Sequence, residues 1–526
     1  MKSLFGFALV IPVAISMAAC GGSSGQPPPP AGPYSDASLH GQYAFSMNGV
    51  DLNGAYIARV GSFLADGTGH ITGGLEDVLA LGTGAPASTV SFTGGTYQIQ
   101  SNGRGLIVLS ASDGGALQLN LVMQSTGTGF LVETDLNATS SGTFNLQKPS
   151  DFSAAALAHP YVFQASGVSF SNLNAAPLGL VGKITPDGSA TITGGVMDTN
   201  DGNVLAPSGA TAISPGTYSL DSSGNGSNFG RGTMVFNGRT FAFYIVDATH
   251  FKLLEEDASG GSMGDALQQT GSIPTQNSQF SGSFVYLIGG ASVLGTQGPV
   301  ARVARFTSDG NGGLSNISLD DNNDGNYTHV SPGGNISAAT YAIDTANAGS
   351  GRGAFTFKDS GTGTYSDVFY MVSPTQAMVQ ETSNGIIGDG ALYAQTGAPF
   401  SLAGSAGTYV SNWSGAQLGS SNAVPFEEDF VNQYTLSNSS SSNISGVTDY
   451  VELGLSSKTL YTNVGLGGTL KMNKDTTLNN EYKFAINGSP SVTVTFQAYF
   501  VNPGTVLMVC SDNTRATAGI INSQQQ

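Results

Sequence analysis

The chain repeats one pattern of residues several times, and this repetition restricts its fold more than any other feature. A Gly-Arg-Gly triplet followed by apolar residues occurs as GRGLIVLS, GRGTMVFN and GRGAFTFK, with its arginine at Arg104, Arg231 and Arg352. A period of about 125 residues is long enough for each copy to form a complete domain with its own core. The chain has 526 residues, so there is room for four such domains.

Other segments recur in the same order as the triplet. Each copy opens on an aromatic residue and continues through a turn, usually Asp-Gly, and a second aspartate follows the turn at a constant spacing. The opening residues are Tyr43, Tyr161, Phe284 and Tyr409, the turn residues are Asp66, Asp187, Asp309 and Asn438, and the later aspartates are Asp77, Asp198, Asp320 and Asp449. We therefore predict four homologous domains, at residues 39–148, 157–270, 279–396 and 400–526, the last being divergent.

Alternating hydrophobicity predicts that these domains are built from strands. The third and fifth positions after the arginine are always large and apolar, whereas the positions between them are mixed. The apolar residues are Ile107, Leu109, Met234, Phe236, Phe355 and Phe357, with Leu470 and Met472 in the fourth copy if Gly467 stands in for the arginine. A period of two with one apolar face is typical of a half-buried strand. The first copy divides into eight such segments: 41–48, 55–65, 69–76, 94–100, 104–110, 116–123, 128–134 and 142–147.

The predicted fold class is all-β, a tandem array of four antiparallel domains. Most connections are short and rich in turn residues, so strands adjacent in sequence should pair. Eight strands in about 110 residues can close into an up-and-down barrel, which removes exposed edges. A two-sheet sandwich is the alternative. The outline resembles lipocalin-like barrels, in which a Gly-x-aromatic also lies on the first strand, as at Gly41 to Tyr43.

The first residues have the layout of an export signal. Lys2 is followed by an apolar run and by small residues before Cys20, so residues 1–19 are predicted to be a signal peptide. The sequence Met-Ala-Ala-Cys at 17–20 resembles the lipobox of bacterial lipoproteins, with Met17 in place of the usual leucine. The resemblance implies that the Cys20 thiol is acylated and becomes the new N-terminus. A plain cleaved signal with an incidental cysteine is the alternative.

Residues 20–38 are rich in Gly, Ser and Pro and are predicted to tether the first domain to the membrane. Gly21 follows the cysteine, and in Gram-negative lipoproteins a residue other than Asp at that position implies sorting to the outer membrane. The predicted location is therefore the outer membrane, on either its periplasmic or its external face. The whole pattern resembles repeat-containing bacterial lipoproteins, a resemblance that implies no particular activity.

The charge balance excludes one class of partner. The chain has 17 basic and 35 acidic residues, for a net charge of −18. Binding to nucleic acid requires clustered Lys and Arg that replace the counterions of phosphates, and the sequence has no such cluster. Only two cysteines are present, so there is no disulfide framework.

Recurring charges predict ion pairs within each barrel. In a meander of strands, the Asp-Gly turn between the second and third strands lies on the rim where the fifth strand begins. We therefore predict structural rim pairs, which are Arg104 with Asp66, Arg231 with Asp187, and Arg352 with Asp309. The alternative is that each aspartate only favours its own turn and each arginine is solvated.

Candidate cofactor and catalytic residues are few. Asp320, Asn322 and Asp324 match the start of a calcium-binding loop, although Ser331 occupies the position of the usual glutamate. A polar turn is the alternative, and no other cofactor is predicted. Paired carboxylates such as Asp77 and Glu133 could suggest glycoside hydrolysis. The five histidines lack zinc-type spacing, and no catalytic residue is assigned.

These observations favour a non-enzymatic envelope protein with a structural or adhesive role, in which repetition adds reach and avidity. The alternative is the carriage of small apolar ligands inside the barrels, which requires hollow interiors lined by small residues. The large side chains of Phe236, Phe355, Phe357 and Met472 favour filled cores instead. A carbohydrate-active enzyme is the third and weakest hypothesis.

Overall fold

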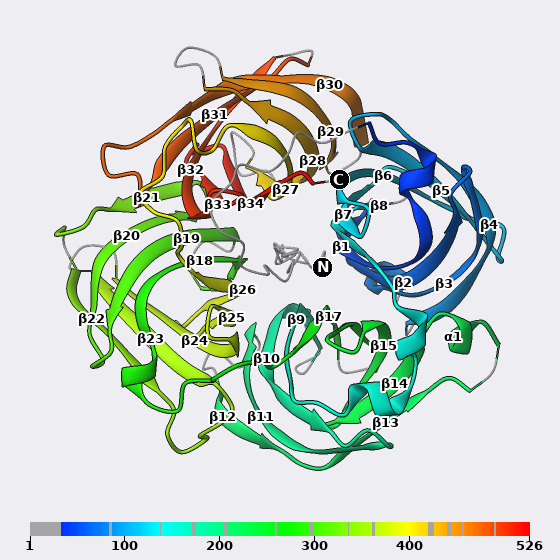
Figure 1. Cartoon of the computed structure of the whole chain (residues 1–526), viewed down its shortest axis with the longest axis horizontal. Coiled ribbons are helices and arrows are strands. Elements are labelled where there is room, and N and C mark those ends of the chain that lie inside the picture. Colours follow the sequence, from blue (N-terminus) through cyan, green and yellow to red (C-terminus); the bar gives the residue numbers. More distant parts are fainter. Residues whose placement is uncertain are drawn as a thin grey trace, which may run out of the picture.

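A computed structural model describes residues 33–83, 87–136, 138–170, 175–202, 208–222, 224–257, 260–294, 298–334, 336–359, 363–418, 426–438, 443–454, 457–488 and 491–525. The predicted signal peptide, Cys20 and most of the tether lie outside these residues. Within the described part of the chain, no helix is long and apolar enough to span a bilayer. The described elements are almost entirely antiparallel strands, arranged in four sheets (Figure 1).

Barrel 1 is a closed sheet of eight strands, each paired with its neighbours in sequence. Its strands are β1 (His40–Asp51), β2 (Tyr56–Asp66), β3 (His70–Ala80), β4 (Ser88–Ile99), β5 (Arg104–Ala111), β6 (Ala116–Ser125), β7 (Thr128–Glu133) and β8 (Ala138–Leu146). Pairing of β1 with β8 closes the barrel, for example Phe45 opposite Phe144. This arrangement confirms the predicted meander and excludes the sandwich for this copy.

Barrel 2 closes in the same way but carries one additional strand. Its strands are β9 (Tyr161–Ser169), β10 (Ala176–Pro186), β11 (Thr191–Asp201), β12 (Ser208–Ile213), β13 (Gly216–Leu220), β14 (Arg231–Phe236), β15 (Arg239–Asp247), β16 (His250–Glu255) and β17 (Gly260–Gln268). The fourth strand of barrel 1 is represented here by two short pieces, β12 and β13, which both pair with β11. A short helix α1 (Gly224–Asn228) precedes β14.

Barrel 3 is nearly closed. Its strands are β18 (Ser281–Ser292), β19 (Gly298–Asp309), β20 (Leu314–Asn323), β21 (Asn326–Val330), β22 (Ile336–Ile343), β23 (Arg352–Asp359), β24 (Gly363–Ser373), β25 (Gln376–Glu381) and β26 (Ile386–Ala394). Here β21 folds back on β20 as a hairpin, so β20 and β22 are joined only by one bridge, between Gly313 and Thr340. The hairpin pairs with part of the edge that would otherwise complete the barrel.

Barrel 4 is again a closed sheet of eight strands, in spite of its divergent sequence. Its strands are β27 (Gly407–Gln417), β28 (Phe426–Leu436), β29 (Ile444–Gly454), β30 (Ser457–Lys471), β31 (Asn480–Ile486), β32 (Val492–Asn502), β33 (Thr505–Cys510) and β34 (Arg515–Ser523). Gly467 lies in the fourth strand, whereas the other arginine triplets begin the fifth. The prediction that Gly467 stands in for the arginine was therefore wrong.

Each barrel encloses its own core of large apolar side chains. In barrel 3, Phe306, Phe355 and Phe357 are almost completely buried and lie against one another, with ring centroids between 5.3 and 5.6 Å apart. A cavity large enough for a water would leave part of the side chains around it accessible to a water-sized sphere, and these side chains have almost no such surface. The described cores are therefore filled, as their large residues predicted.

The segment that precedes each barrel covers one end of its core. These segments contain the 3-10 helices η1 (Asp36–Ser38), η3 (Pro149–Asp151), η4 (Ala154–Leu157) and η6 (Asn277–Gln279), and η2 (Leu81–Thr83) follows β3. The apolar residues that enter the cores are Leu39, Leu157, Phe280 and Phe400. The Tyr97 hydroxyl donates to the Leu39 carbonyl at 2.8 Å, and the Tyr341 hydroxyl does the same to Phe280 at 2.8 Å. An inter-barrel segment is thus part of the core that follows it.

The four barrels form a ring rather than an extended string (Figure 1). At each interface, which we call a seam, the first strands of one barrel contact the last three strands of the next, and barrel 4 contacts barrel 1 in the same way through β28 and β6 to β8. Three apolar clusters fill the seams, including Val431 of barrel 4 with Val122 and Phe130 of barrel 1. The expectation that repetition adds reach is not met by this arrangement.

Candidate functional site

Each seam is built around an aspartate that one barrel presents to the next. Between barrels 1 and 2, Arg231 forms a bidentate ion pair with Asp77, with Nε to Oδ2 at 2.7 Å and Nη2 to Oδ1 at 3.0 Å. The Tyr244 hydroxyl donates to the same carboxylate at 2.8 Å. Asp77 is completely buried, so these charge-assisted hydrogen bonds compensate for its removal from water.

The seam between barrels 2 and 3 repeats this arrangement. Arg352 binds Asp198 through Nε at 2.7 Å and Nη2 at 2.8 Å, and the Tyr370 hydroxyl donates at 2.7 Å. Burial, followed by the nearby aspartate, raises the pKa of both Tyr244 and Tyr370 above the ordinary value. Both hydroxyls therefore remain protonated and act as donors at neutral pH.

The seam between barrels 3 and 4 has the tyrosine without the arginine. The Tyr499 hydroxyl donates to Oδ2 of Asp320 at 2.5 Å. The other oxygen contacts Tyr327 and His329, both from barrel 3. The fifth strand of barrel 4 begins at Asn480, and the residues around it include no arginine.

The seam that closes the ring has the arginine without the tyrosine. Arg104 of barrel 1 pairs with Asp449 of barrel 4 through Nη2, and its Nη1 donates to Oδ1 of Asn463 at 2.9 Å. The Asn463 backbone N–H also donates to Asp449, at 2.6 Å. Val122 pairs with Arg104 across the sheet, at the position that Tyr244 and Tyr370 occupy in the next two barrels. The same aspartate is thus engaged at all four seams.

These contacts overturn the predicted rim pairs. The arginines point outward from the fifth strand and bind the preceding barrel, so Arg104 does not meet Asp66, nor Arg231 Asp187, nor Arg352 Asp309. The three turn aspartates instead accept backbone N–H groups two residues ahead, from Thr68, Ser189 and Asn311, at 2.7 to 2.8 Å. The alternative that each aspartate favours its own turn is therefore correct for the aspartates. Its second part, that each arginine is solvated, is wrong.

A glutamine from the end of each barrel completes every seam. Gln147 donates Nε2 to the Phe229 and Ile245 carbonyls of barrel 2, and Gln269 donates to Ser350 and Met371 of barrel 3. The corresponding residues at the other two seams are Gln395, bonded to Thr477 and Phe500, and Gln524, bonded to Asn102 and Met123. The non-covalent closure of the ring therefore reproduces contacts of the three covalently linked seams.

The carboxylates proposed for hydrolysis do not face one another. Asp77 points out of barrel 1 toward Arg231, whereas Glu133 points inward and pairs with Arg59 at 3.3 Å. Glu255 and Glu381, the counterparts of Glu133, also pair with arginines. Residues on opposite faces of a barrel wall cannot act on one substrate, so the paired-carboxylate hypothesis has no support in this geometry.

The predicted calcium loop is part of the hairpin formed by β20 and β21. Asn322 donates Nδ2 to the Cys510 and Arg515 carbonyls, both at 2.7 Å, and Asp320 belongs to the seam described above. Asp324 lies in the turn, with φ of 51°. Among the described residues, no group of three or more His, Cys, Asp or Glu side chains could hold a metal ion. Other residues of the chain thus bind Asp320 and Asn322. The calcium site stays a prediction that this geometry does not support.

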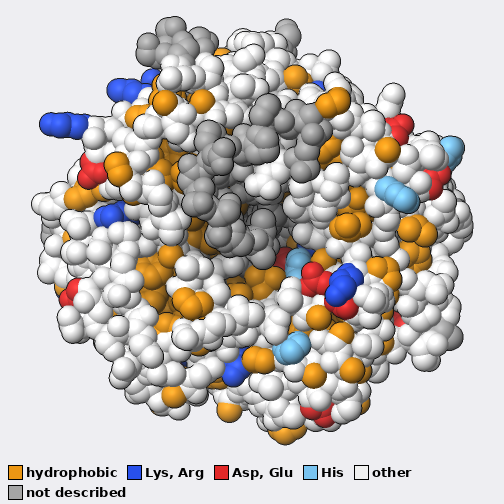
Figure 2. Space-filling model, viewed as in Figure 1, with side chains coloured by type: hydrophobic (Ala, Val, Ile, Leu, Met, Phe, Trp, Pro, Cys, Tyr) orange, Lys and Arg blue, Asp and Glu red, His pale blue; other side chains and the backbone are white. Residues whose placement is uncertain are grey.

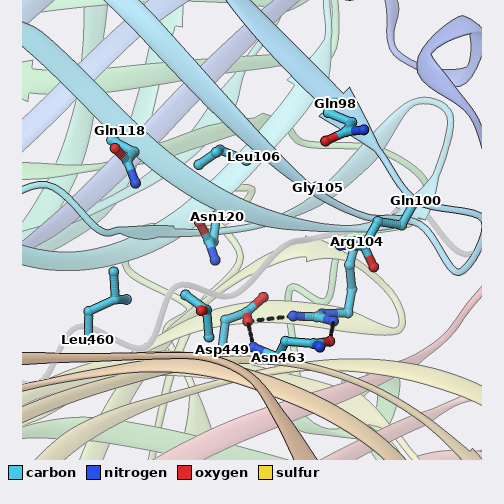
Figure 3. Close-up of a pocket in the computed structure, with 11 residues that line it drawn as sticks. Gln98, Gln100, Arg104, Gly105, Leu106, Gln118, Asn120, Asp449, Leu460 and Asn463 are labelled. Atoms are coloured by element: carbon cyan, nitrogen blue, oxygen red, sulfur yellow. Dashed lines mark hydrogen bonds and ion pairs between the residues drawn. The ribbon is translucent and has the colours of Figure 1, made fainter.

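A cleft lies beside the ring-closing ion pair, between the outer faces of barrels 1 and 4 (Figure 3). We call it the slot, and its volume is about 470 Å³. Its lining residues are Gln98, Gln100, Arg104, Gly105, Leu106, Gln118 and Asn120 from barrel 1, and Asp449, Leu460, Thr462 and Asn463 from barrel 4. Apart from Arg104 and Asp449, which neutralise each other, every lining residue is uncharged.

No family model and no curated protein matches the chain. Transferrin binding protein B from serogroup B Neisseria meningitidis is 10% identical, with a TM-score of 0.22 over 75% of this chain and 82% of that one. CghA is 9% identical, with a TM-score of 0.18 over 70% of this chain and 88% of that one. A putative AttH from Nitrosomonas europaea is 9% identical, with a TM-score of 0.17 over 72% of this chain and 97% of that one. Scores this low carry no argument about function.

Proposed function

We propose that the chain is a lipid-anchored, non-enzymatic protein of the bacterial outer membrane whose ring of barrels serves as a rigid structural or adhesive platform. The observation that carries this proposal is the combination of four filled cores with four buried seams. Filled cores leave no room for an apolar cargo. A buried aspartate at each seam, bound across the seam by an arginine at three seams and by Tyr499 at the fourth, holds the barrels in one arrangement.

The surface supports the same proposal. Figure 2 shows that one face of the ring exposes scattered apolar side chains and few charged ones. The whole chain has only 10% charged residues, against about 25% in typical soluble proteins. Such a face offers hydroxyl and amide groups for contact with other molecules, without the strong field that would select a highly charged partner.

The lipid anchor is supported by the lipobox resemblance at Cys20 and is directly testable. The full chain, exported in a Gram-negative host, is labelled with a palmitate analogue and its membrane fraction is analysed by mass spectrometry. We expect the label on the wild type and on Cys510→Ser, since Cys510 is buried in barrel 4, but not on Cys20→Ser. Absence of label from the wild type, or its retention in Cys20→Ser, would contradict the anchor.

Carriage of apolar ligands is tested separately. A fluorescent fatty acid titrated into the purified chain should show no saturable binding, because the described cores contain no space for an alkyl chain. Saturable binding that is lost when Phe355 is replaced by Trp would revive the carrier hypothesis, since a larger side chain there would fill an interior site.

A further inference from the structure

The slot at the ring-closing seam has a lining that points to one class of ligand. We propose that it binds a neutral saccharide of one or two sugar units. This inference rests on the adhesive role proposed above and names the chemistry that the ring would recognise. It concerns binding alone, because no carboxylate of the slot is free to act as a catalytic acid or base.

The loop of barrel 1 that lies beside the slot is shorter than its counterparts in the other barrels. The fourth and fifth strands are joined by residues 100–103 in barrel 1, but by 221–230, 344–351 and 472–479 in the other barrels. The longer loops reach over the preceding barrel. Asn228 accepts a hydrogen bond from Gln42, Gly349 accepts one from Lys183, and Thr477 accepts one from Gln395. The shorter loop of barrel 1 also contacts barrel 4, because Asn102 donates to Gln433 at 3.5 Å and accepts from Gln524 at 2.9 Å, and the slot lies beside these contacts.

Unpaired polar groups converge on this space. Gln98 and Gln118 make no side-chain hydrogen bond to any described residue, and Figure 3 shows both on the barrel 1 side of the slot. Arg104 is 3% exposed, and its Nε has no partner among the described residues. This Nε has almost no accessible surface, and the other guanidinium nitrogens bind Asp449 and Asn463, so Arg104 fixes one wall of the slot and offers no donor to a ligand. The hydrogen-bonding groups that the slot leaves free are therefore those of Gln98 and Gln118.

The lining is suited to hydroxyl groups. Each carboxamide offers both a donor and an acceptor, as a sugar hydroxyl does, and the slot has five carboxamides, on Gln98, Gln100, Gln118, Asn120 and Asn463. Leu106 and Leu460 are each 38% exposed and come from opposite walls. They provide apolar contact for the C–H groups of a sugar ring. The neutral lining disfavours phosphates and other charged ligands.

A peptide would have to be recognised differently. An extended peptide gains affinity by adding a strand to a free sheet edge. The barrel 1 wall of the slot is instead the face of a closed sheet, in which β5 pairs with β4 on one side and with β6 on the other. Its backbone groups are already used, so recognition on this wall occurs through side chains.

The test uses the full-length chain in detergent, with lactose, maltose, cellobiose and diacetylchitobiose as probes. Saturation-transfer NMR and calorimetry would measure binding to the wild type and to Gln98→Ala/Gln118→Ala. We expect at least one disaccharide to bind, and the double variant to weaken it about tenfold, since two hydrogen bonds are lost. Thr240→Ala is the matched control, because Thr240 occupies the position of Gln118 in barrel 2 and should leave binding unchanged.

Two further arms make the result decisive. The peptide Gly-Ser-Asn-Thr-Gly, with an acetylated N-terminus and an amidated C-terminus that remove its charges, and inorganic phosphate should not compete with the disaccharide. The proposal is overturned if no saccharide binds, if the double variant binds as tightly as the wild type, or if the peptide alone binds in a manner that depends on Gln98 and Gln118. Acylation of Cys20 is measured independently, so failure of the anchor and failure of the saccharide site can be told apart.

Discussion

Single residues carry most of the specificity of the seams. Arg231 and Asp77 meet in a site where Asp77 has no exposed surface and Arg231 is largely buried. Removing one partner of such a pair leaves a buried charge without compensation, which usually costs several kcal/mol. The same arginine on an exposed rim would contribute less than about 1 kcal/mol.

We therefore predict that Arg231→Ala lowers the free energy of unfolding by about 3 kcal/mol. Asp187→Asn is the control, since it alters only an exposed turn that Asn also favours, and it should cost less than about 1 kcal/mol. Urea denaturation followed by fluorescence would compare them. Equal losses for the two variants would mean that the seam contact adds nothing to stability.

A second residue, Asp389, should make the stability of the chain depend on pH. Burial raises the pKa of Asp389 to about 7, although a hydrogen bond from Ser166 of barrel 2 opposes the shift. The unfolded carboxyl titrates near 3.9. Between these values the folded chain holds a proton that the unfolded chain has lost, so stability decreases as pH rises from about 4 to about 7 and stays lower above that.

Asp389→Asn removes this titration, and we expect the variant to gain stability relative to the wild type at pH 8 but not at pH 4. Each pKa unit corresponds to about 1.4 kcal/mol, so the gain is a few kcal/mol at most. Melting temperatures across the pH range would measure it. The exposed turn variant Asp113→Asn serves as control, and a wild-type-like pH profile for Asp389→Asn would refute the assignment.

At the level of elements, the strands of barrel 1 could be predicted closely from sequence, but their outer contacts could not. The segment 104–110 corresponds to β5 (Arg104–Ala111), because its alternation reflects one face in the core. The partner of Arg104 lies 345 residues away, and no local pattern specifies that distance. An overlooked signal was the uninterrupted apolar run in strands such as β15 (Arg239–Asp247), which indicates burial on both faces.

The fourth copy shows the second limit of sequence reasoning. Leu470 lies in the core as predicted, yet it belongs to β30 rather than to the fifth strand. Neighbouring strands of a barrel show the same alternation of apolar and polar residues. The pattern therefore predicted correctly that Leu470 faces the core, but it assigned Leu470 to the wrong strand. The slot could not be predicted at all, because it depends on how two barrels meet over a short loop.

The terminal glutamines provide a prediction about these elements. Gln269→Ala and Gln524→Ala each leave two backbone carbonyls without a donor, which costs about 1 to 3 kcal/mol. Barrels 2 and 3 remain covalently linked, whereas barrels 4 and 1 meet only through non-covalent contacts. Gln524→Ala should therefore raise the rate of hydrogen exchange in β6 and β7. Gln269→Ala should raise the rate in β24 and β25 by a smaller factor. Equal increases would contradict this difference between the seams.

At the scale of the whole molecule, the ring makes a measurable difference to size. A compact chain of this length has a radius of gyration of about 24 Å, whereas four barrels on flexible links would be considerably larger. Small-angle scattering should give a value near the compact one for the wild type. A markedly larger radius would mean that the ring opens in solution.

The ring also predicts that the chain tolerates a change of termini. The Tyr34 hydroxyl contacts the Gln525 carbonyl, so a short Gly-Ser linker can join the two ends of the described chain. New termini between Gly271 and Ser272 fall in the exposed segment before barrel 3. This circular permutant should keep the melting temperature of the parent within a few degrees. Loss of cooperative melting would indicate that the link between barrels 2 and 3 is required.

The seam between barrels 4 and 1 has a consequence for biosynthesis. The apolar residues Val122, Phe130 and Val132 on the outside of barrel 1 are covered in the finished ring by a barrel that is translated last. During synthesis this patch emerges hundreds of residues before its cover exists. The patch therefore stays exposed until the C-terminal barrel arrives, and a truncated chain ending before residue 400 should aggregate through this face.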